Sequence, residues 1–258
     1  MLNNKVKQKR HQTRKYRGGN KKNLAILLYG RINSYEHSLE YFNSVYKNPN
    51  FNCRVFCSLN LKKKTPYIEE FCKLLDISDE QLNIESTVVP KEFTDMNKNA
   101  CSTNKFPCNS IYSSHYHQNK AFKLIEAYSN KHNIKYDIVI AFRIDTHPSN
   151  NESKIFPIEN NIEPNTLYIP RISNKNTSID ETKNISDCYN NGISTFHTYG
   201  DFDTMKKYCD LINHISRIDA PEIVVLDYLK KINVKIKRFV HEITKNPQRT
   251  NSKYNKND

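Results

Sequence analysis

Short apolar runs alternate with helical patterns along most of the chain, and this alternation constrains the fold more than any other feature of the sequence. "NLAILLYG" (23–30) and the apolar part of "YDIVIAFRIDT" (136–146) have the length of strands, and a long amphipathic pattern over residues 113–132 precedes the second. Continuously apolar strands are typical of parallel sheets that are buried on both faces. We therefore expect an α/β fold, a single domain whose mostly parallel central sheet is flanked by helices.

The remaining elements are predicted from the same periodicities and from turn residues. Pro66 after Thr65 marks a helix start, and Asp219 with Glu222 has the spacing of a capping box in front of the last helix. Residues 91–110 look irregular. Further strands are expected at 51–59, 82–90, 165–171, 193–196 and 234–243, the last of them an edge strand, and further helices at 34–46, 65–76, 201–215 and 217–231.

The charge of the chain is concentrated at its N-terminus. Residues 1–22 hold nine of the 40 Lys and Arg residues and no acid, so without them the net charge falls from +13 to +4. Such an apolar-poor segment does not offset its own ordering entropy. We expect a basic disordered arm at 1–22, a domain at 23–243 and a polar tail at 244–258. The arm could bind nucleic acid or an anionic surface, or simply be solvated.

Several classes of protein are excluded by what the sequence lacks. No apolar region follows the basic N-terminus, so it does not have the form of a signal peptide, and no run approaches the roughly 18 apolar residues of a membrane span. Seven irregularly spaced cysteines without a C-x-x-C pair favour a reducing compartment over a disulfide framework or a zinc ribbon. The sequence therefore predicts a soluble cytoplasmic protein.

Polar residues follow the predicted strands at the point where ligands bind in open α/β sheets, beyond the C-terminal ends of the strands. Gly30 and Arg31 follow the first strand, Ser58 and Asn60 end the second, and Asp145 comes just after the apolar run 138–142. A carboxylate in this place either belongs to a site or has a structural role, since Asp145 could cap the following turn or pair with Arg143.

The stretch "YDIVIAFRIDT" after a long helix resembles the metal-binding strand of GT-A-fold glycosyltransferases, which use nucleotide-sugar donors. "AILLYGRINSYEHSLE" (25–40) is similar to the first strand and following loop of the same enzymes. In that family the metal strand commonly ends in Asp-x-Asp, whereas this chain has the variant Arg143-x-Asp145. The resemblance covers roughly residues 23 to 241 and implies a GT-A-like (Rossmann-like) domain.

The resemblance also implies roles for individual residues. Asp145 would ligate Mn²⁺ or Mg²⁺, a hard cation that neutralises the diphosphate released from the donor, and His241 would be a further ligand. Arg143 would add a positive charge, which could weaken the metal site or contact phosphate. Tyr29, Gly30, Arg31, Ser58, Lys120, Arg143 and Asn191 are the expected donor-binding residues, and Asp187 and Glu222 the expected catalytic acids.

Several of these residues also have a purely structural interpretation. Capping alone accounts for Glu222, which would otherwise be a general base, and a tight turn accounts for Asn191 before Gly192. His115 and His117 are two positions apart on a helix, so they do not face each other as a metal-binding pair. His241 could be an ordinary surface or core residue.

The predicted function is that of a glycosyltransferase, moving a hexosyl or related sugar from a nucleotide-sugar donor to a glycan or protein acceptor with a divalent metal. Two alternatives stay open. A basic nucleic-acid-binding protein would use the arm and some of the 16 tyrosines for contacts, and the missing first aspartate would fit a glycosyltransferase-like protein without activity.

Overall fold

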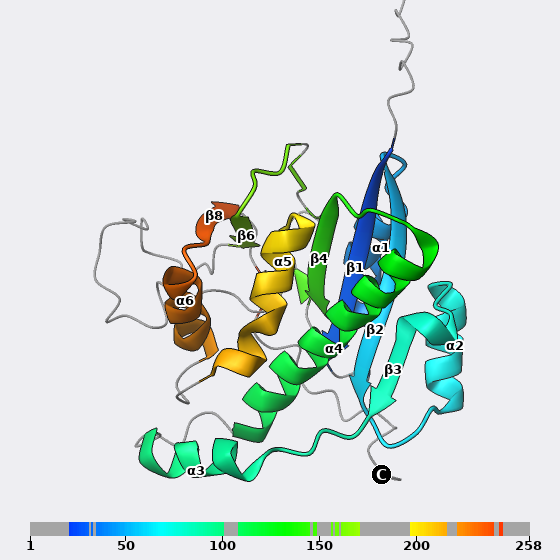
Figure 1. Ribbon diagram of the computed structural model, residues 1–258. Helices are drawn as coiled ribbons and strands as arrows, with labels where there is room; N and C mark the ends of the chain where they lie inside the picture. Colours follow the sequence, from blue (N-terminus) through cyan, green and yellow to red (C-terminus); the bar gives the residue numbers. More distant parts are fainter. Residues whose placement is uncertain are drawn as a thin grey trace, which may run out of the picture.

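The chain forms a seven-stranded sheet with helices on both faces (Figure 1). The computed structural model describes residues 21–30, 32, 35–100, 108–144, 147–148, 156, 158–159, 161–170, 197–215, 221–239 and 243–244. Within these residues the sheet consists of β1 (Lys22–Gly30), β2 (Phe51–Asn60), β3 (Leu82–Glu85), β4 (Ile138–Arg143), β6 (Thr166–Pro170), β7 (His197–Gly200) and β8 (Lys235–Phe239), in the order β3-β2-β1-β4-β7-β6-β8. A separate two-stranded sheet pairs β5 (His147–Pro148) with β9 (Ile243–Thr244).

The sheet is mostly parallel, as expected. β1 is parallel to its neighbours β2 and β4, and β2 is parallel to β3. Within the seven-stranded sheet, the strand antiparallel to its neighbours is β7, which lies between β4 and β6. β8 ends the sheet beside β6, so the edge strand predicted at 234–243 is confirmed over Lys235–Phe239, whereas Ile243 belongs to β9.

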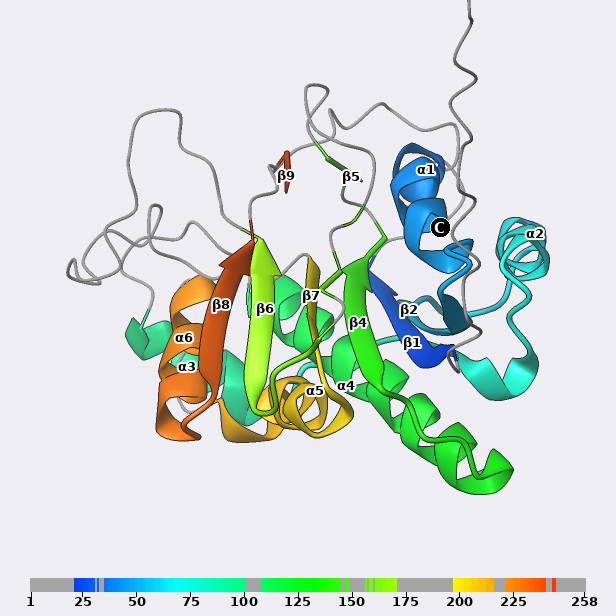
Figure 2. The ribbon, with the colours of Figure 1, turned by 90° about the horizontal axis from the view of Figure 1, so that it is seen from above.

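The helices form two layers, seen from above in Figure 2, with α1 and α2 on one face of the sheet and α4, α5 and α6 on the other. None of the helices in the described ranges has the length and apolar content that a bilayer span requires. The α-helices are α1 (Tyr35–Tyr46), α2 (Pro66–Leu74), α3 (Lys91–Ala100), α4 (Cys108–His132), α5 (Phe202–Cys209) and α6 (Pro221–Lys231), and short 3₁₀ helices are η1 (Asp79–Gln81) and η2 (Asp210–His214).

β1 shows why the apolar runs form buried central strands. Leu24, Ile26 and Leu28 point into the core beneath α1 and α2, whereas Ala25, Leu27 and Tyr29 point into the core beneath α4. Alternate residues of a strand face opposite sides, so an uninterrupted apolar run is suited to a sheet covered on both faces. The α/β fold predicted from the sequence is confirmed.

Two predicted regions differ from the structure. Residues 91–100 and 108–110 are helical instead of irregular, since they form α3 and the first turn of α4. Phe93 of α3 and Ile111 of α4 are buried in one small apolar cluster. The third strand ends at Glu85 instead of continuing to residue 90, since the backbone N–H of Thr87 bonds to the side chain of Asn60 and no longer to a strand. The predicted strand 193–196 lies outside the described residues, and β7 begins directly after it.

Candidate functional site

The order of the strands reverses between β1 and β4, which places a topological switch point at the C-terminal ends of these two strands. From β1 the chain runs outward to β2 and β3, and α4 then returns it to the other side of β1, where β4 begins. The arrowheads of β2, β3 and β4 point to one edge of the sheet, and α4 crosses in front of β1 and β2 (Figure 1). The position where the strand order reverses, here between β1 and β4, is where open α/β sheets bind ligands.

Three of the predicted donor-binding residues form a row across this edge. Tyr29 of β1 is in register with Ser58 of β2 on one side and with Arg143 of β4 on the other. Partners in register point to the same face of a parallel sheet, and for this row it is the face that carries α4. Tyr29 and Ser58 are buried, whereas Arg143 is partly exposed at the end of its strand.

Gly30 ends β1 with a positive φ of 109°. This region of φ is open to glycine at little cost and strained for other residues. Gly30 still pairs with Leu59 of β2, so this backbone conformation lies within the last pair of the strand. The backbone N–H of Ile144 bonds to the carbonyl of Tyr29 at 2.9 Å, which holds the ends of β1 and β4 together.

α4 packs over the Ser58 end of this row and contributes a buried histidine, His117. Nδ1 of His117 lies 2.8 Å from Oγ of Ser58, and Nε2 lies 2.7 Å from Oγ1 of Thr87. Only 2% of His117 is exposed, so both ring nitrogens have a protein partner where water has no access. His117 thus joins the end of β2 to the connection after β3.

The same network continues to the exposed edge. Oγ1 of Thr87 lies 3.2 Å from Oγ of Ser113, which also accepts a bond from Nδ2 of Asn60 at 2.9 Å. On the other side of the histidine, Nδ2 of Asn83 donates to Ser58 at 3.0 Å and to the carboxylate of Glu85 at 2.8 Å. The hydroxyls and amides therefore satisfy one another, and the network fixes the N-terminal half of α4 over β2 and β3.

Charges near this network are paired. Nζ of Lys120 lies 3.4 Å from Oε1 of Glu85 and 5.1 Å from the ring centre of Tyr116. Burial opposes ionisation of Glu85, but its bonds with Asn83 and Lys120 hold the pKa of the carboxyl below its ordinary value. Bonding to Tyr116 raises the pKa of Lys120. The predicted donor residue Lys120 is thus already engaged by two side chains of the protein.

Burial also controls the histidines of α4. Loss of hydration lowers the pKa of His117 to about 4, with a smaller opposing effect from Glu85. His117 is consequently neutral at pH 7, with one nitrogen a donor and the other an acceptor.

Most of the predicted metal and catalytic residues fall outside the part of the chain that the structure describes. Glu222 is in the first turn of α6, but its side chain is not among those described. Within the described ranges no group of three or more His, Cys, Asp or Glu side chains could hold a metal ion. The predicted residues that lie outside the described residues altogether are Arg31, Asp145, Asp187, Asn191 and His241.

The two-stranded sheet brings together the segments that follow two of these residues. His147, two positions after Asp145, pairs with Thr244, and Pro148 pairs with Ile243, which is two positions after His241. The chain after the R-x-D motif and the chain near the C-terminus therefore lie side by side.

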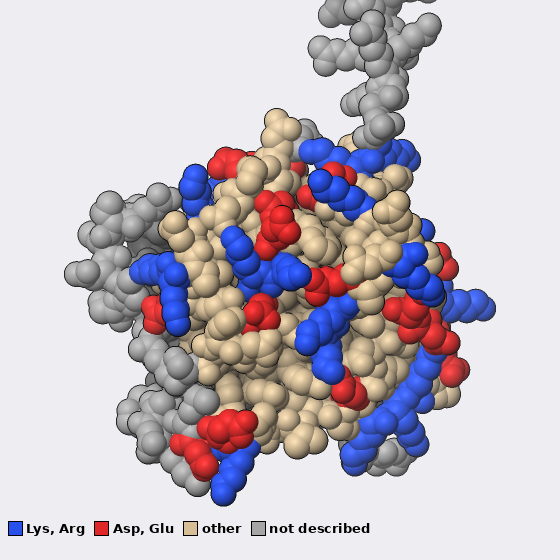
Figure 3. All heavy atoms as spheres, in the orientation of Figure 1, with Lys and Arg blue, Asp and Glu red and all other residues tan. Residues whose placement is uncertain are grey.

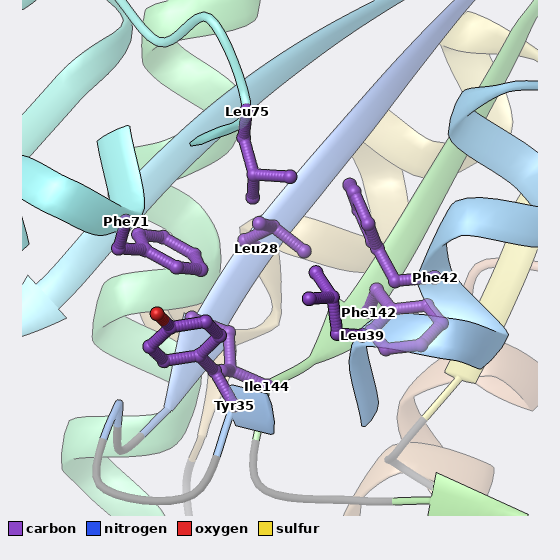
Figure 4. Close-up of a pocket in the computed structure, with 8 residues that line it drawn as sticks. All are labelled: Leu28, Tyr35, Leu39, Phe42, Phe71, Leu75, Phe142 and Ile144. Atoms are coloured by element: carbon purple, nitrogen blue, oxygen red, sulfur yellow. The ribbon is translucent and has the colours of Figure 1, made fainter. Parts of the chain in front are cut away.

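An apolar cavity lies on the opposite face of the sheet. Eight side chains from β1, α1, α2 and the β4 end line it, among them Leu28, Phe42 and Phe142 (Figure 4). Its volume is about 10 Å³, enough for roughly one water molecule. A nucleotide-sugar does not fit in this cavity, whereas the polar side chains at the C-terminal ends of the strands offer hydrogen-bonding groups.

No sequence pattern indicates the role of His117 in this network. The spacing of His117 from His115 argues only against a metal pair, and no motif singles out Thr87 or Ser113. A signal exists on the helix itself, because Ser113 and His117 are four positions apart and therefore lie on one face of α4. Their partners lie 26 to 59 positions away, which no local pattern indicates.

No family model matches this sequence, and no curated protein matches it. Several solved structures do. A glycosyltransferase involved in glycosylation of the major capsid of PBCV-1 is 12% identical, over 85% of this chain and 81% of that chain, with a TM-score of 0.36. A nucleoside-diphosphate-sugar pyrophosphorylase from Vibrio cholerae RC9 is 13% identical over 85% and 93% of the two chains, with a TM-score of 0.40. A 4-diphosphocytidyl-2C-methyl-D-erythritol synthase from Anaerococcus prevotii DSM 20548 is 10% identical over 86% and 88%, with a TM-score of 0.41. At these identities and scores the likeness establishes no activity for this chain.

Proposed function

We propose that this protein is a glycosyltransferase that binds a nucleotide-sugar over the C-terminal ends of β1, β2 and β4 and transfers its sugar to a glycan or protein acceptor. The observation that carries the proposal is the row of Ser58, Tyr29 and Arg143 in register across the point where the strand order reverses. The row combines the expected ligand position of an α/β sheet with a cation at the strand end. It also contains three of the residues expected from the resemblance to GT-A-fold enzymes.

Arg143 supplies the charge that a diphosphate needs. The guanidinium binds phosphate oxygens through paired N–H groups and stays protonated at any physiological pH. Arg143 is the last residue of β4, and its side chain lies on the same face of the sheet as Tyr29. In this proposal it contacts the donor diphosphate together with Arg31.

The metal belongs to the same proposal. Mn²⁺ or Mg²⁺ held by Asp145, with His241 as a further ligand, would neutralise the charge that develops on the leaving diphosphate. Asp145 and His241 both lie outside the described residues, so their roles as ligands rest on the resemblance to GT-A-fold enzymes. Glu222 as general base and Asp187 with Asn191 at the sugar complete the proposed site.

The first test measures binding of nucleoside diphosphates by calorimetry in wild type and in Arg143→Ala. Loss of a charge-assisted bond should weaken binding by about 1.5–3 kcal/mol. Arg54→Ala is the matched control, because Arg54 is an exposed arginine on the same face of the sheet but at the start of β2. Equal affinities of wild type and Arg143→Ala would remove Arg143 from the site.

The second test measures turnover of a panel of nucleotide-sugars and the metal dependence of binding in Asp145→Asn. The substitution keeps the shape of the side chain and removes its charge, so Mn²⁺-dependent stabilisation by nucleoside diphosphate should disappear and transfer should fall by orders of magnitude. If Asp145 only caps a turn or pairs with Arg143, the variant will instead unfold about 1 kcal/mol more easily and bind metal and nucleotide normally. That second outcome would contradict the proposed site.

A further inference from the structure

A chain of hydrogen bonds runs from Asn83 of β3, through buried side chains of β2 and α4, to the exposed Asn60 at the end of β2. We call it the polar chain; its members in order are Asn83, Ser58, His117, Thr87, Ser113 and Asn60. Hydroxyls and a neutral histidine can each donate or accept, so the positions of the atoms alone leave the direction of the bonds open. The two ends of the polar chain settle that direction.

The inner end is fixed by a carboxylate. The side-chain amide of Asn83 lies 2.8 Å from Oε1 of Glu85 and 3.0 Å from Oγ of Ser58. An ionised carboxylate only accepts, so the atom of Asn83 that faces it is the NH₂ group. The amide therefore donates to Ser58 as well, and the hydroxyl of Ser58 has its own proton left to give.

The outer end is fixed by a backbone N–H. The N–H of Thr87 bonds at 2.9 Å to the side chain of Asn60, and a backbone N–H only donates. The atom of Asn60 that receives it is the carbonyl oxygen, which leaves the NH₂ group of Asn60 to donate to Oγ of Ser113 at 2.9 Å.

Between these ends two directions are possible. If His117 carries its proton on Nδ1, it donates to Ser58, and the proton of the fully buried Ser58 hydroxyl is left over in a place without water. If His117 carries its proton on Nε2, Ser58 donates to Nδ1, Nε2 donates to Thr87, and Thr87 donates to Ser113. The second direction satisfies every buried donor, and an unsatisfied buried donor costs more free energy than an exposed one.

In the second direction Ser113 accepts from both Thr87 and Asn60. Both lone pairs of its oxygen are then used, and its own proton is available outside the polar chain. Ser113 is partly exposed, and it lies over the ends of β2 and β3, beyond Ser58 in the row that ends at Arg143. β2 and β4 are two strand spacings apart, which is about 10 Å. A ligand with its diphosphate at Arg143 and its nucleoside directed along this row would bring the nucleoside to Ser113.

We propose that Ser113 is a specificity-determining residue of the nucleotide-sugar site proposed above, and that its hydroxyl donates a hydrogen bond to an acceptor oxygen or nitrogen of the nucleoside. His117 and Thr87 are positioning residues that hold Ser113 as a donor. The inference rests on the proposed function for its ligand, whereas the direction of the polar chain stands on the contacts alone.

The test measures binding of UDP, CDP, ADP, GDP and inorganic pyrophosphate by calorimetry in wild type and in Ser113→Ala. The nucleoside diphosphate that wild type binds most tightly should bind about 3- to 10-fold more weakly to Ser113→Ala, because one neutral hydrogen bond is lost. Pyrophosphate, which has no nucleoside, should bind both proteins equally. Ser114→Ala, a change at the neighbouring partly exposed serine of α4, should leave all affinities unchanged.

Three outcomes separate this inference from the proposed function. Unchanged nucleoside diphosphate affinity in Ser113→Ala overturns the inference and leaves the function standing. An equal loss for pyrophosphate shows a general structural effect and overturns it too. A wild type that binds none of these nucleotides removes the proposed function, and with it the role of Ser113 in binding.

The direction of the polar chain has a test that needs no ligand. Imidazole ¹⁵N shifts at pH 7 should show His117 as the tautomer protonated on Nε2. Protonation on Nδ1 would reverse the polar chain, make Ser113 a donor to Thr87, and overturn the inference even where nucleotides bind.

Discussion

Burial sets the charge state of two histidines in the N-terminal half of α4. His115 and His117 are 3% and 2% exposed, and loss of hydration lowers the pKa of each to about 4. Gln118 acts against this at His115, and Glu85 acts against it at His117, but neither restores the ordinary value. The N-terminal half of α4 therefore contains two buried neutral imidazoles, and one of them, His117, links Ser58 to Thr87 in the polar chain.

This neutrality predicts a pH dependence of stability. In the unfolded chain a histidine takes up its proton near pH 6.5, whereas in the folded protein His115 and His117 do so near pH 4. Between these values the unfolded state binds more protons, so the free energy of unfolding falls with falling pH, by about 3 kcal/mol per histidine. Urea unfolding at pH 7, 5.5 and 4 should show a shallower fall in His117→Gln than in wild type. Parallel curves for the two proteins would contradict the buried neutral state of His117.

The sequence predicted which strands end in polar residues, but not which of those residues meet. Ser58, Tyr29 and Arg143 could be proposed because each is at or next to the end of an apolar run, where a parallel sheet exposes its edge. Their alignment depends on how the strands pair in register, and that pairing involves residues far apart in the sequence, so no local pattern reveals it. Ser58 also shows the limit of such reasoning, since it is fully buried and its hydroxyl is occupied by Asn83 and His117.

Helices and strands were predicted correctly where a strand is buried on both faces and therefore reads as a long apolar run. They were missed where an element is short or polar. β1, β2 and β4 were found within a residue or two of their bounds. α3 was missed because it is polar and its described packing rests on Phe93. β7 was missed because none of its four residues, His197 to Gly200, is aliphatic, so no apolar pattern indicates a strand although all four are buried.

The start of α5 allows a direct test of capping. The carboxylate of Asp201 accepts a bond from the backbone N–H of Thr204 at 2.6 Å, and its other oxygen accepts from the backbone N–H of Asn165 at 3.1 Å. Asp201→Ala should lower the free energy of unfolding by about 1 kcal/mol or somewhat more. Asp203→Ala removes an exposed acid from the same helical turn and should cost only a few tenths of a kcal/mol. Equal losses in urea unfolding would show that the cap bond contributes nothing beyond charge.

In the part of the chain that the structure describes, the surface formed by α4, α5 and α6 has no concentration of positive charge. Lys and Arg are interspersed with Asp and Glu on the face that carries α4, α5 and α6 (Figure 3). Several are paired directly, as in Lys206 with Glu126 at 2.6 Å and Lys131 with Glu80 at 2.6 Å. A mixed surface gives little long-range attraction for a polyanion, so this face is a poorer candidate for nucleic-acid binding than the basic N-terminal residues.

The last prediction tests the role of those residues. β1 begins at Lys22, which pairs with Phe51, so removal of residues 1–20 leaves the first strand complete. The removed segment carries seven Lys and Arg residues and no acid. The shortened protein should melt within a few degrees of the full chain, because no described strand or helix loses a residue. It should bind single-stranded RNA and phosphatidylserine vesicles more weakly, with a smaller dependence of RNA affinity on salt.

A variant of unchanged length, in which the same seven residues are replaced by Ser or Asn, separates charge from chain. It should match the shortened protein in binding if the attraction is electrostatic. A melting temperature lowered by much more than a few degrees would show that residues 1–20 pack on the domain. Undiminished RNA binding by both variants would place the nucleic-acid contacts on the domain itself, which would favour the nucleic-acid-binding alternative over the glycosyltransferase.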